Sequence, residues 1–282
     1  MEYDIFETQE VSLLVPPTSY QGGKQRIAGQ ILDIISSSKE TKFYDLCCGC
    51  GAISLELVNR GHNPKKITMV DKGPWGLFWK AVGSGQFDLN HFYNICSNVP
   101  SDVAKIQGFM ESLSKQSSSI DTIYVFLLLQ ASSFGGKAIW IKDGCWKNFT
   151  CRSYWLPTAT SKRRSPVNPM MPMVETLKDR VRNICDRMHG VDAFCDDIHK
   201  IEIDNGIAYI DPPYSGTTVY GYICDVMEFV RENGHISIYI SEGVPLGSEV
   251  VKISSGRDKG GIYGGHRKKV NEEWLSIFIP GE

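Results

Sequence analysis

A four-residue motif, Asp211-Pro212-Pro213-Tyr214, directly follows a short apolar run at 207–210 that is typical of a buried strand. The two prolines fix their φ angles and lack backbone N–H groups, so Asp211 and the neighbouring carbonyls form a surface that only accepts hydrogen bonds. Such a surface suits a planar amino group, whose hydrogens Asp211 and a carbonyl can accept while Tyr214 stacks on the ring. A proline-rich loop without chemistry is the alternative.

A second candidate site is the glycine-rich turn Asp45–Gly51, which follows another short predicted strand. Its small side chains let a nucleotide-like ligand approach the backbone at Gly49 and Gly51 and the start of the following helix. Asp71 ends the next predicted strand, where an acid can accept hydrogen bonds from both hydroxyls of a ribose. An ordinary turn between strand and helix is the alternative, and Ser54 at the third-glycine position disfavours a nicotinamide dehydrogenase.

The periodicity of apolar residues predicts the elements that hold these two sites. Strand, glycine-rich turn, helix and strand at 42–70 form a βαβ unit, which implies a parallel sheet. The chain is therefore predicted to be an α/β domain with an irregular insertion. In chain order we predict a helix bearing Ile27, Ile31, Leu32 and Ile35, a strand at 42–46, a helix bearing Ile53, Leu55, Leu57 and Val58 that ends near Gly61, a strand at 66–70, a helix bearing Val174, Leu177, Val181, Ile184 and Met188, strands at 207–210, 236–240 and 274–279, and a helix at 221–231.

Residues 131–172 show little periodicity and carry clustered positive charge. Seven basic residues stand against one acid there, and six against one in 252–270, which gives net charges of +6 and +5. Since the whole chain has a formal net charge of −2, the remaining residues carry −13, and the near-neutral total does not exclude a nucleic-acid partner. Basic residues interleaved with aromatic ones suit phosphate contacts and base stacking, and a solvated surface loop is the alternative. The candidate DNA contacts are Lys137, Arg152, Arg163, Arg164 and Arg267.

The composition excludes several classes of protein. The chain has 282 residues, of which 42% are hydrophobic and 22% charged, unlike a disordered tail, a collagen-like rod or a coiled coil. The longest apolar run, 124–131, is too short to span a bilayer, and residues 1–4 lack the pattern of a signal peptide, so no membrane association is expected. The nine cysteines predict reduced thiols in a cytosol. Cys47 and Cys50 form a lone Cys-x-x-Cys pair, so no metal is expected.

The motif at 211–214 resembles the catalytic motif of S-adenosylmethionine-dependent methyltransferases that act on amino groups in DNA. Residues 20–24, Tyr-Gln-Gly-Gly-Lys, are similar to the aromatic-x-Gly-Gly-Lys segment of the Dam-type adenine-N6 branch. Further segments that resemble this branch are Asp45–Gly51 as the cofactor loop, Asp71 as the ribose-binding acid, Tyr124–Trp140 with its turn Phe134–Gly136, and Val270–Glu272 with Trp274–Phe278 as the closing strand. The chain therefore resembles the Dam-type (D12 class, alpha group) DNA adenine-N6 methyltransferase family.

This resemblance implies a class I S-adenosylmethionine-dependent methyltransferase fold, which is a Rossmann-like α/β sheet. Residues 1–130 and 173–282 would form the catalytic domain, and 131–172 an inserted basic target-recognition region. The implied reaction moves a methyl group from S-adenosylmethionine to the N6 amino group of adenine in double-stranded DNA, after the base leaves the duplex. We expect the protein in the cytoplasm of a prokaryotic cell, or encoded by a phage.

The resemblance also implies roles for individual residues. The implied cofactor-binding residues are Tyr20, Lys24, Asp45, Gly49, Gly51, Asp71, Phe194 and Asp211. Lys24 would pair with the methionine carboxylate of the cofactor, Asp71 with its ribose, and Phe194, with Asp196 or Asp197, with its adenine. The implied catalytic residues are Asp211, Pro212, Pro213 and Tyr214.

Two alternatives remain open at this level. The same mechanism can act on another amino group, such as cytosine N4, RNA or a glutamine amide. The second alternative is that the chain is a non-catalytic DNA-binding relative of the family. Its motive is that Cys47 stands where the family has phenylalanine and Gly135 where it has asparagine. The sequence does not specify the recognition site, the oligomeric state, or a role in restriction, regulation or phage biology.

Overall fold

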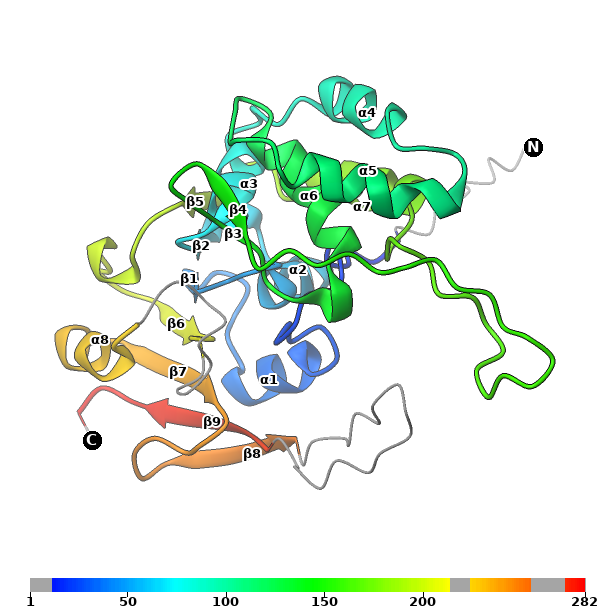
Figure 1. Cartoon of the computed structure of the whole chain (residues 1–282). Helices are drawn as coiled ribbons and strands as arrows, with labels where there is room; N and C mark the ends of the chain where they lie inside the picture. The colour runs from blue at the N-terminus through cyan, green and yellow to red at the C-terminus, as the bar shows by residue number, and fades with distance from the viewer. Residues whose placement is uncertain (1–11, 214–223, 255–271, 282) are drawn as a thin grey trace, which may run out of the picture.

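A computed structural model describes residues 12–213, 224–254 and 272–281. A mixed β-sheet with helices packed on it forms the centre of this α/β fold (Figure 1). Within these residues, seven strands pair in the order β5-β2-β1-β6-β7-β9-β8. The pairings from β5 to β7 are all parallel, whereas β9 runs antiparallel to both β7 and β8. The strands are β1 (Phe43–Leu46), β2 (Ile67–Val70), β5 (Asp192–Phe194), β6 (Ile207–Ile210), β7 (Ser237–Glu242), β8 (Val250–Ser254) and β9 (Glu273–Phe278). This architecture is compatible with the predicted Rossmann-like methyltransferase fold.

Alternation of side chains along the strands divides the core into two layers. Successive residues of a strand point to opposite faces, so Phe43 joins a large apolar cluster while Tyr44 joins a smaller one. Met69 and Val70 of β2 are divided in the same way. Because both faces are covered, β1 and β2 are buried at every position and are mostly apolar.

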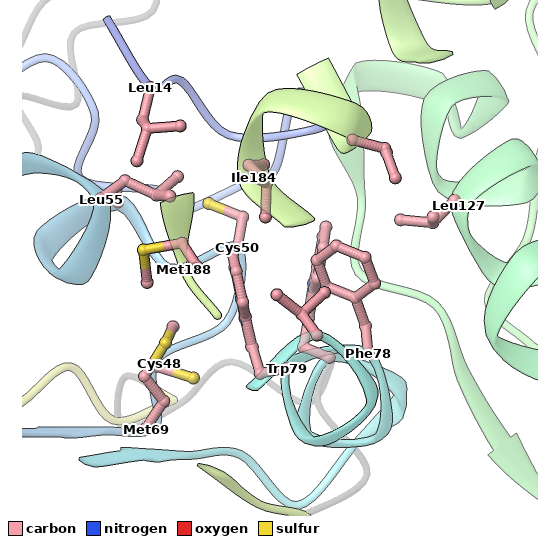
Figure 2. Close-up of a cluster of buried hydrophobic side chains, with 14 of the residues drawn as sticks. Leu14, Cys48, Cys50, Leu55, Met69, Phe78, Trp79, Leu127, Ile184 and Met188 are labelled. Atoms are coloured by element: carbon pink, nitrogen blue, oxygen red, sulfur yellow. The ribbon is translucent and has the colours of Figure 1, made fainter. Parts of the chain in front are cut away.

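Most of the helices pack into the large cluster, whereas α8 packs on the opposite face (Figure 1). Figure 2 shows side chains from β2, α2, α3, α6 and α7 meeting there, with Met69 and Trp79 among them. None of the described helices is long and apolar enough to cross a bilayer. The helices are α1 (Ala28–Ile35), α2 (Ala52–Asn59), α3 (Pro74–Gly83), α4 (Leu89–Ser97), α5 (Val103–Leu113), α6 (Thr122–Ser132), α7 (Val174–Arg187) and α8 (Val226–Glu232), with short 3-10 turns η1 (Pro64–Lys66), η2 (Phe134–Gly136) and η3 (Ile198–Lys200).

The predicted strands and amphipathic helices are present at or near their expected positions. The helix expected at 221–231 is observed as α8 (Val226–Glu232), while 221–223 lie outside the described residues. Strands β3 (Trp140–Lys142), β4 (Cys145–Lys147), β5 and β8 and helices α3 to α6 were not predicted. Helix α3 is buried on most sides, so its sequence lacks a polar face that would show helical periodicity.

The segment 131–172 contains little regular structure, in agreement with its lack of periodicity. A short antiparallel hairpin pairs β3 (Trp140–Lys142) with β4 (Cys145–Lys147). Beyond it, Trp155 and Val167 form an isolated bridge, and the chain around this bridge projects from the body as a long loop (Figure 1).

Candidate active site

The parallel strands bring the two predicted sites to one edge of the sheet. Leu46, the last residue of β1, pairs with Val70 of β2 and with Ile210 of β6. Cys47, from which the glycine-rich turn continues to Gly51, and the acids Asp71 and Asp211 each follow one of these residues, so these segments leave the sheet side by side at its carboxyl edge. In open α/β sheets this edge is where ligands bind.

The glycine-rich turn has a backbone shape that other residues would strain. Gly49 and Gly51 have positive φ angles of 49° and 74°, in the left-handed region. A Cβ at Gly51 would lie 2.4 Å from Cζ2 of Trp79. The indole Nε1 of Trp79 donates a hydrogen bond to the carbonyl of Gly49 at 2.8 Å. Helix α3 therefore packs against the turn and fixes its backbone through Trp79.

Asp45 supports the turn from inside the core. Its carboxylate accepts hydrogen bonds from the backbone N–H of Ser54 at 3.2 Å and from the Ser54 hydroxyl at 2.6 Å. Ser54 lies in the first turn of α2, so Asp45 satisfies a free N–H group at the start of that helix. Burial raises the pKa of Asp45 to about 7. Asp45 is 2% exposed, so its contacts are with α2 rather than with the open edge.

Asp71 connects the end of β2 to the turn. Its carboxylate accepts hydrogen bonds from the N–H of Gly49 at 3.1 Å and of Gly73 at 2.7 Å. Burial raises its pKa, and these two hydrogen bonds oppose that rise. The N–H of Asp71 donates to the carbonyl of Phe194 at 3.2 Å, so the end of β5 lies beside it. The structure thus brings Asp71, Gly49 and the backbone of Phe194 together.

A buried lysine binds the carboxylate of the Asp-Pro-Pro motif. Lys24 is 5% exposed, and its Nζ lies 2.5 Å from Oδ1 of Asp211 and 3.4 Å from Oε1 of Glu273 on β9. Glu273 also accepts a hydrogen bond from the hydroxyl of Ser241 at 2.6 Å. Sequence reasoning missed Glu273. An acid directly before the strand predicted at 274–279 is the signal that marks it.

Burial and the neighbouring charges shift the pKa values of Asp211 and Lys24 in opposite directions. Burial raises the pKa of Asp211 to about 6, and the charge of Lys24 opposes the rise. For Lys24, burial lowers the pKa, but the charges of Asp211 and Glu273 outweigh it and the pKa is raised. At neutral pH Lys24 is charged and Asp211 is mostly ionised.

The segment containing Tyr20 lies against both the turn and the Phe134–Gly136 turn. A Cβ at Gly49 would lie 3.0 Å from Cε1 of Tyr20, whose ring centroid is 5.8 Å from that of Trp75. The N–H of Gln21 donates to the carbonyl of Gly136 at 2.6 Å. Three segments that resemble the family, far apart in the chain, are therefore neighbours in space.

The remaining predicted site residues are more dispersed. Pro212 is buried and Pro213 half-buried, while Tyr214 and Arg267 lie outside the described residues. Arg163 and Arg164 are exposed on the projecting loop, where their guanidinium groups contact backbone carbonyls of the same loop. The half-buried residues Lys137 and Arg152 lie closer to the body, near η2 and Met171.

The described part of the chain contains no group of three or more His, Cys, Asp or Glu side chains arranged to hold a metal ion. The acids at the carboxyl edge instead bind backbone N–H groups, a hydroxyl and Lys24.

One segment of the chain matches a known protein family. Residues 20–72 match the family model of D12 class N6 adenine-specific DNA methyltransferase. The match confirms the predicted family. It contains Lys24, the glycine-rich turn and Asp71, and the family is one of enzymes. The Asp-Pro-Pro motif lies outside the matched residues. No curated protein matches the chain.

Replacing Gly51 by alanine tests the packing of the turn. Gly51→Ala adds a Cβ that lies 2.4 Å from Trp79 and 2.8 Å from Cε of Met69, at a φ of 74°. We expect a loss of about 1–3 kcal/mol in the free energy of unfolding from overpacking, in addition to the backbone strain. The control is Gly135→Ala, at a φ of 69° with nothing within 4 Å. Urea unfolding of both variants measures the difference, and equal losses would contradict the packing role.

The buried carboxyl of Asp45 makes stability depend on pH. Because its pKa is raised to about 7, its protonated form stabilises the folded state below about pH 4, and this stabilisation is lost as pH rises through 7. The contribution is on the order of 4 kcal/mol at most. We therefore expect Asp45→Asn to become more stable relative to wild type between pH 4 and 8. Urea unfolding at each pH tests this, with exposed Asp204→Asn as the control, and parallel curves for Asp45→Asn and wild type would refute it.

Proposed function

We propose that this chain transfers a methyl group from S-adenosylmethionine to the N6 amino group of adenine in DNA, with the target base flipped out of the duplex. The observation that carries this proposal is the ion pair between Lys24 and Asp211 at 2.5 Å. Lys24 lies inside the segment that matches the D12 class model, whereas Asp211 lies outside it. The pair supports the proposal, because it joins the Asp-Pro-Pro motif to the segment that resembles the family's cofactor-binding region.

The side chains at the carboxyl edge suit S-adenosylmethionine. The carboxylate of Asp71 lies beside the backbone of the glycine-rich turn, where it can also reach ribose hydroxyls. Lys24 supplies a cation for the methionine carboxylate, and the two acids around it, Asp211 and Glu273, favour a sulfonium cation nearby. Tyr20 and Phe194, with Asp196 or Asp197, would complete the pocket. When bound, the cofactor supplies an electrophilic methyl group.

Asp211 and the carbonyl of Pro212 would act on the nucleophile. The lone pair of an aromatic amino group is conjugated with its ring, which makes the nitrogen a weak nucleophile. Acceptors aimed at its two hydrogens localise the lone pair on nitrogen, and fixed geometry supplies much of the remaining acceleration. Since the pKa of Asp211 is about 6, its carboxylate is available as an acceptor at neutral pH.

The basic segment 131–172 would contact the DNA. We infer that it is a target-recognition region inserted into a catalytic domain formed by 1–130 and 173–282. Its net charge of +6, the exposed Arg163 and Arg164, and the projecting loop that carries them support this assignment (Figure 1). Phosphate contacts of this kind strengthen binding to any sequence and position the enzyme on the duplex. A DNA-modifying enzyme of this kind fits the cytoplasm of a prokaryotic cell, or a phage-encoded role.

A single assay tests the reaction. Purified protein is incubated with S-adenosylmethionine and genomic DNA that lacks adenine methylation, and modified bases are mapped by single-molecule sequencing. We expect N6-methyladenine at one recurrent sequence. Methylation of cytosine N4 alone would replace the proposal by its nearest alternative, and cofactor binding without any methylation would indicate a non-catalytic relative.

Removing the charge of Asp211 should abolish the reaction. Asp211→Asn keeps the size of the side chain but replaces one acceptor oxygen by a donor. We expect a loss of at least about 100-fold in the rate of methyl transfer, the effect of removing one preorganised polar group. Tritiated-methyl incorporation into DNA measures it, and circular dichroism reports the fold. The exposed Asp186→Asn is the matched control. Wild-type incorporation by Asp211→Asn would overturn this assignment.

Reversing the charge of two arginines should weaken DNA binding. In the double variant Arg163→Glu/Arg164→Glu, two phosphate contacts are lost, so the slope of log Kd against log salt concentration should fall by about 2. Lys65→Glu/Lys66→Glu is the control, because this exposed pair precedes β2 at the opposite edge of the sheet. Fluorescence anisotropy with a duplex over a salt series gives both slopes. The same change in both variants would show that total charge, not this loop, determines binding.

A further inference from the structure

Glu273 reaches the carboxyl edge of the sheet on a strand that runs in the opposite direction. Strand β9 is antiparallel to β7, so its first residues lie beside the last residues of β7, where Trp274 pairs with Glu242. The side chain of Glu273 is 15% exposed. The parallel strands supply this edge with residues that follow their carboxyl ends, and the reversed strand adds a largely buried acid from its start.

The hydroxyl of Ser241 holds the carboxylate of Glu273 in place. Ser241 lies near the end of β7 and is completely buried. Its hydroxyl donates a hydrogen bond to Oε1 of Glu273 at 2.6 Å. The same oxygen lies 3.4 Å from Nζ of Lys24. The hydroxyl therefore keeps this oxygen of the carboxylate beside the lysine.

Three acceptors surround the ammonium group of Lys24. Its Nζ donates to the carbonyl of Gly22 at 3.0 Å, lies 2.5 Å from Oδ1 of Asp211 and faces Oε1 of Glu273. Lys24 contacts Oδ1 of Asp211, and no residue in the described part of the chain donates a hydrogen bond to Oδ2. Because two carboxylates share one cation, the positive charge of Lys24 does not act on Asp211 alone.

We propose that Glu273 is a positioning residue for the reaction proposed above, on which this inference rests: held by Ser241, its carboxylate shares the charge of Lys24 and so keeps Asp211 a strong acceptor for the hydrogens of the target amino group. If Asp211 were the one carboxylate beside Lys24, the ion pair would be tighter and the carboxylate a weaker acceptor. Glu273 acts through Lys24 in this proposal.

The shift in the pKa of Asp211 agrees with this geometry. Burial raises the pKa of Asp211 to about 6, the charge of Lys24 opposes the rise, and the charge of Glu273 adds to it. Removing the charge of Glu273 should therefore lower the pKa of Asp211. A carboxylate with a lower pKa is a weaker proton acceptor.

Other ionisable groups also face Asp211. Asp45 on β1 has a pKa raised by burial to about 7, and burial raises the pKa of Glu242 at the end of β7. Burial also raises the pKa of Tyr209 and of Cys50, while a hydrogen bond to another thiol, together with burial, raises that of Cys47, so these three groups are neutral below pH 8. Since the other carboxyl groups titrate in the same range as Asp211, its pKa must be read from its own signal.

Carboxyl NMR measures the effect of Glu273 on Asp211 and requires no enzymatic activity. The full chain, labelled with carbon-13 at its aspartate carboxyl groups, is titrated with acid, and the signal of Asp211 is the one that Asp211→Asn lacks. We expect the pKa of Asp211 to fall by about one pH unit in Glu273→Gln, because a nearby like charge is lost. An unchanged pKa would overturn the proposal.

The matched control is Glu272→Gln. Glu272 directly precedes Glu273, is 41% exposed and pairs with Lys252 on β8. Its replacement removes the same charge from the same part of the chain, and the pKa of Asp211 should keep its wild-type value. Equal shifts in the two variants would show that total charge, not the contact with Lys24, determines the pKa of Asp211, and this would also overturn the proposal.

Two further variants separate the charge of Glu273 from its position. Glu273→Asp keeps the charge on a shorter side chain and should restore part of the wild-type pKa of Asp211. Ser241→Ala keeps the charge but removes the hydroxyl that holds it, so the pKa should fall by less than in Glu273→Gln. Circular dichroism and urea unfolding report the fold of each variant. A shift in folded Glu273→Asp as large as that in folded Glu273→Gln would contradict a role for the charge.

The kinetics should follow if the proposed function holds. We expect kcat for methyl transfer, at saturating S-adenosylmethionine and DNA, to fall below about pH 6 in the wild type as Asp211 becomes protonated. In Glu273→Gln this acidic limb should move to lower pH, while kcat at pH 8 should fall by roughly 3-fold to 10-fold. A purely structural role would not move the limb, so a lower kcat with an unmoved limb would contradict the proposal. Absence of methyl transfer by the wild type would contradict the proposed function and leave the NMR result intact.

Discussion

One buried cation connects the parts of this protein that form the candidate site. Lys24 comes from the N-terminal segment, Asp211 follows β6, and Glu273 begins β9. Lys24 is 5% exposed, and an unpaired charge buried to this extent would cost several kcal/mol, so it is tolerated there because the two carboxylates lie beside it. The N-terminal segment and the two strands must therefore assemble together. The same contact holds the carboxylate of Asp211 at the carboxyl edge of the sheet.

The glycine-rich turn depends on a second set of carboxylates. Asp45 satisfies an N–H group at the start of α2, and Asp71 accepts hydrogen bonds from the turn itself. Both groups have raised pKa values because they are buried, and their hydrogen bonds offset part of that effect. Residues that the family resemblance assigns to the cofactor thus also support the backbone around it. A substitution at Asp45 or Asp71 is therefore expected to affect folding as well as binding.

Local patterns revealed a large part of the fold. A central parallel strand is a short apolar run bounded by turn residues, so β1, β2, β6 and β7 are visible without knowledge of their neighbours. Helices α4 and α5 were overlooked, although Asp88 and Asp102 are N-caps and such residues mark helix starts. Strand β5 has three residues, two of them exposed, and so carries no distinct pattern.

The amino-acid sequence was sufficient to propose a chemistry for the candidate site, because the Asp-Pro-Pro motif and the glycine-rich turn are each defined by consecutive residues. It was not sufficient for the contacts between them. The pairing of Lys24 with Asp211 and Glu273 joins residues far apart in the chain. No periodicity encodes such contacts. Only the order and direction of the strands in the folded sheet bring these side chains together, and burial and the neighbouring charges there shift the pKa values of Lys24 and Asp211.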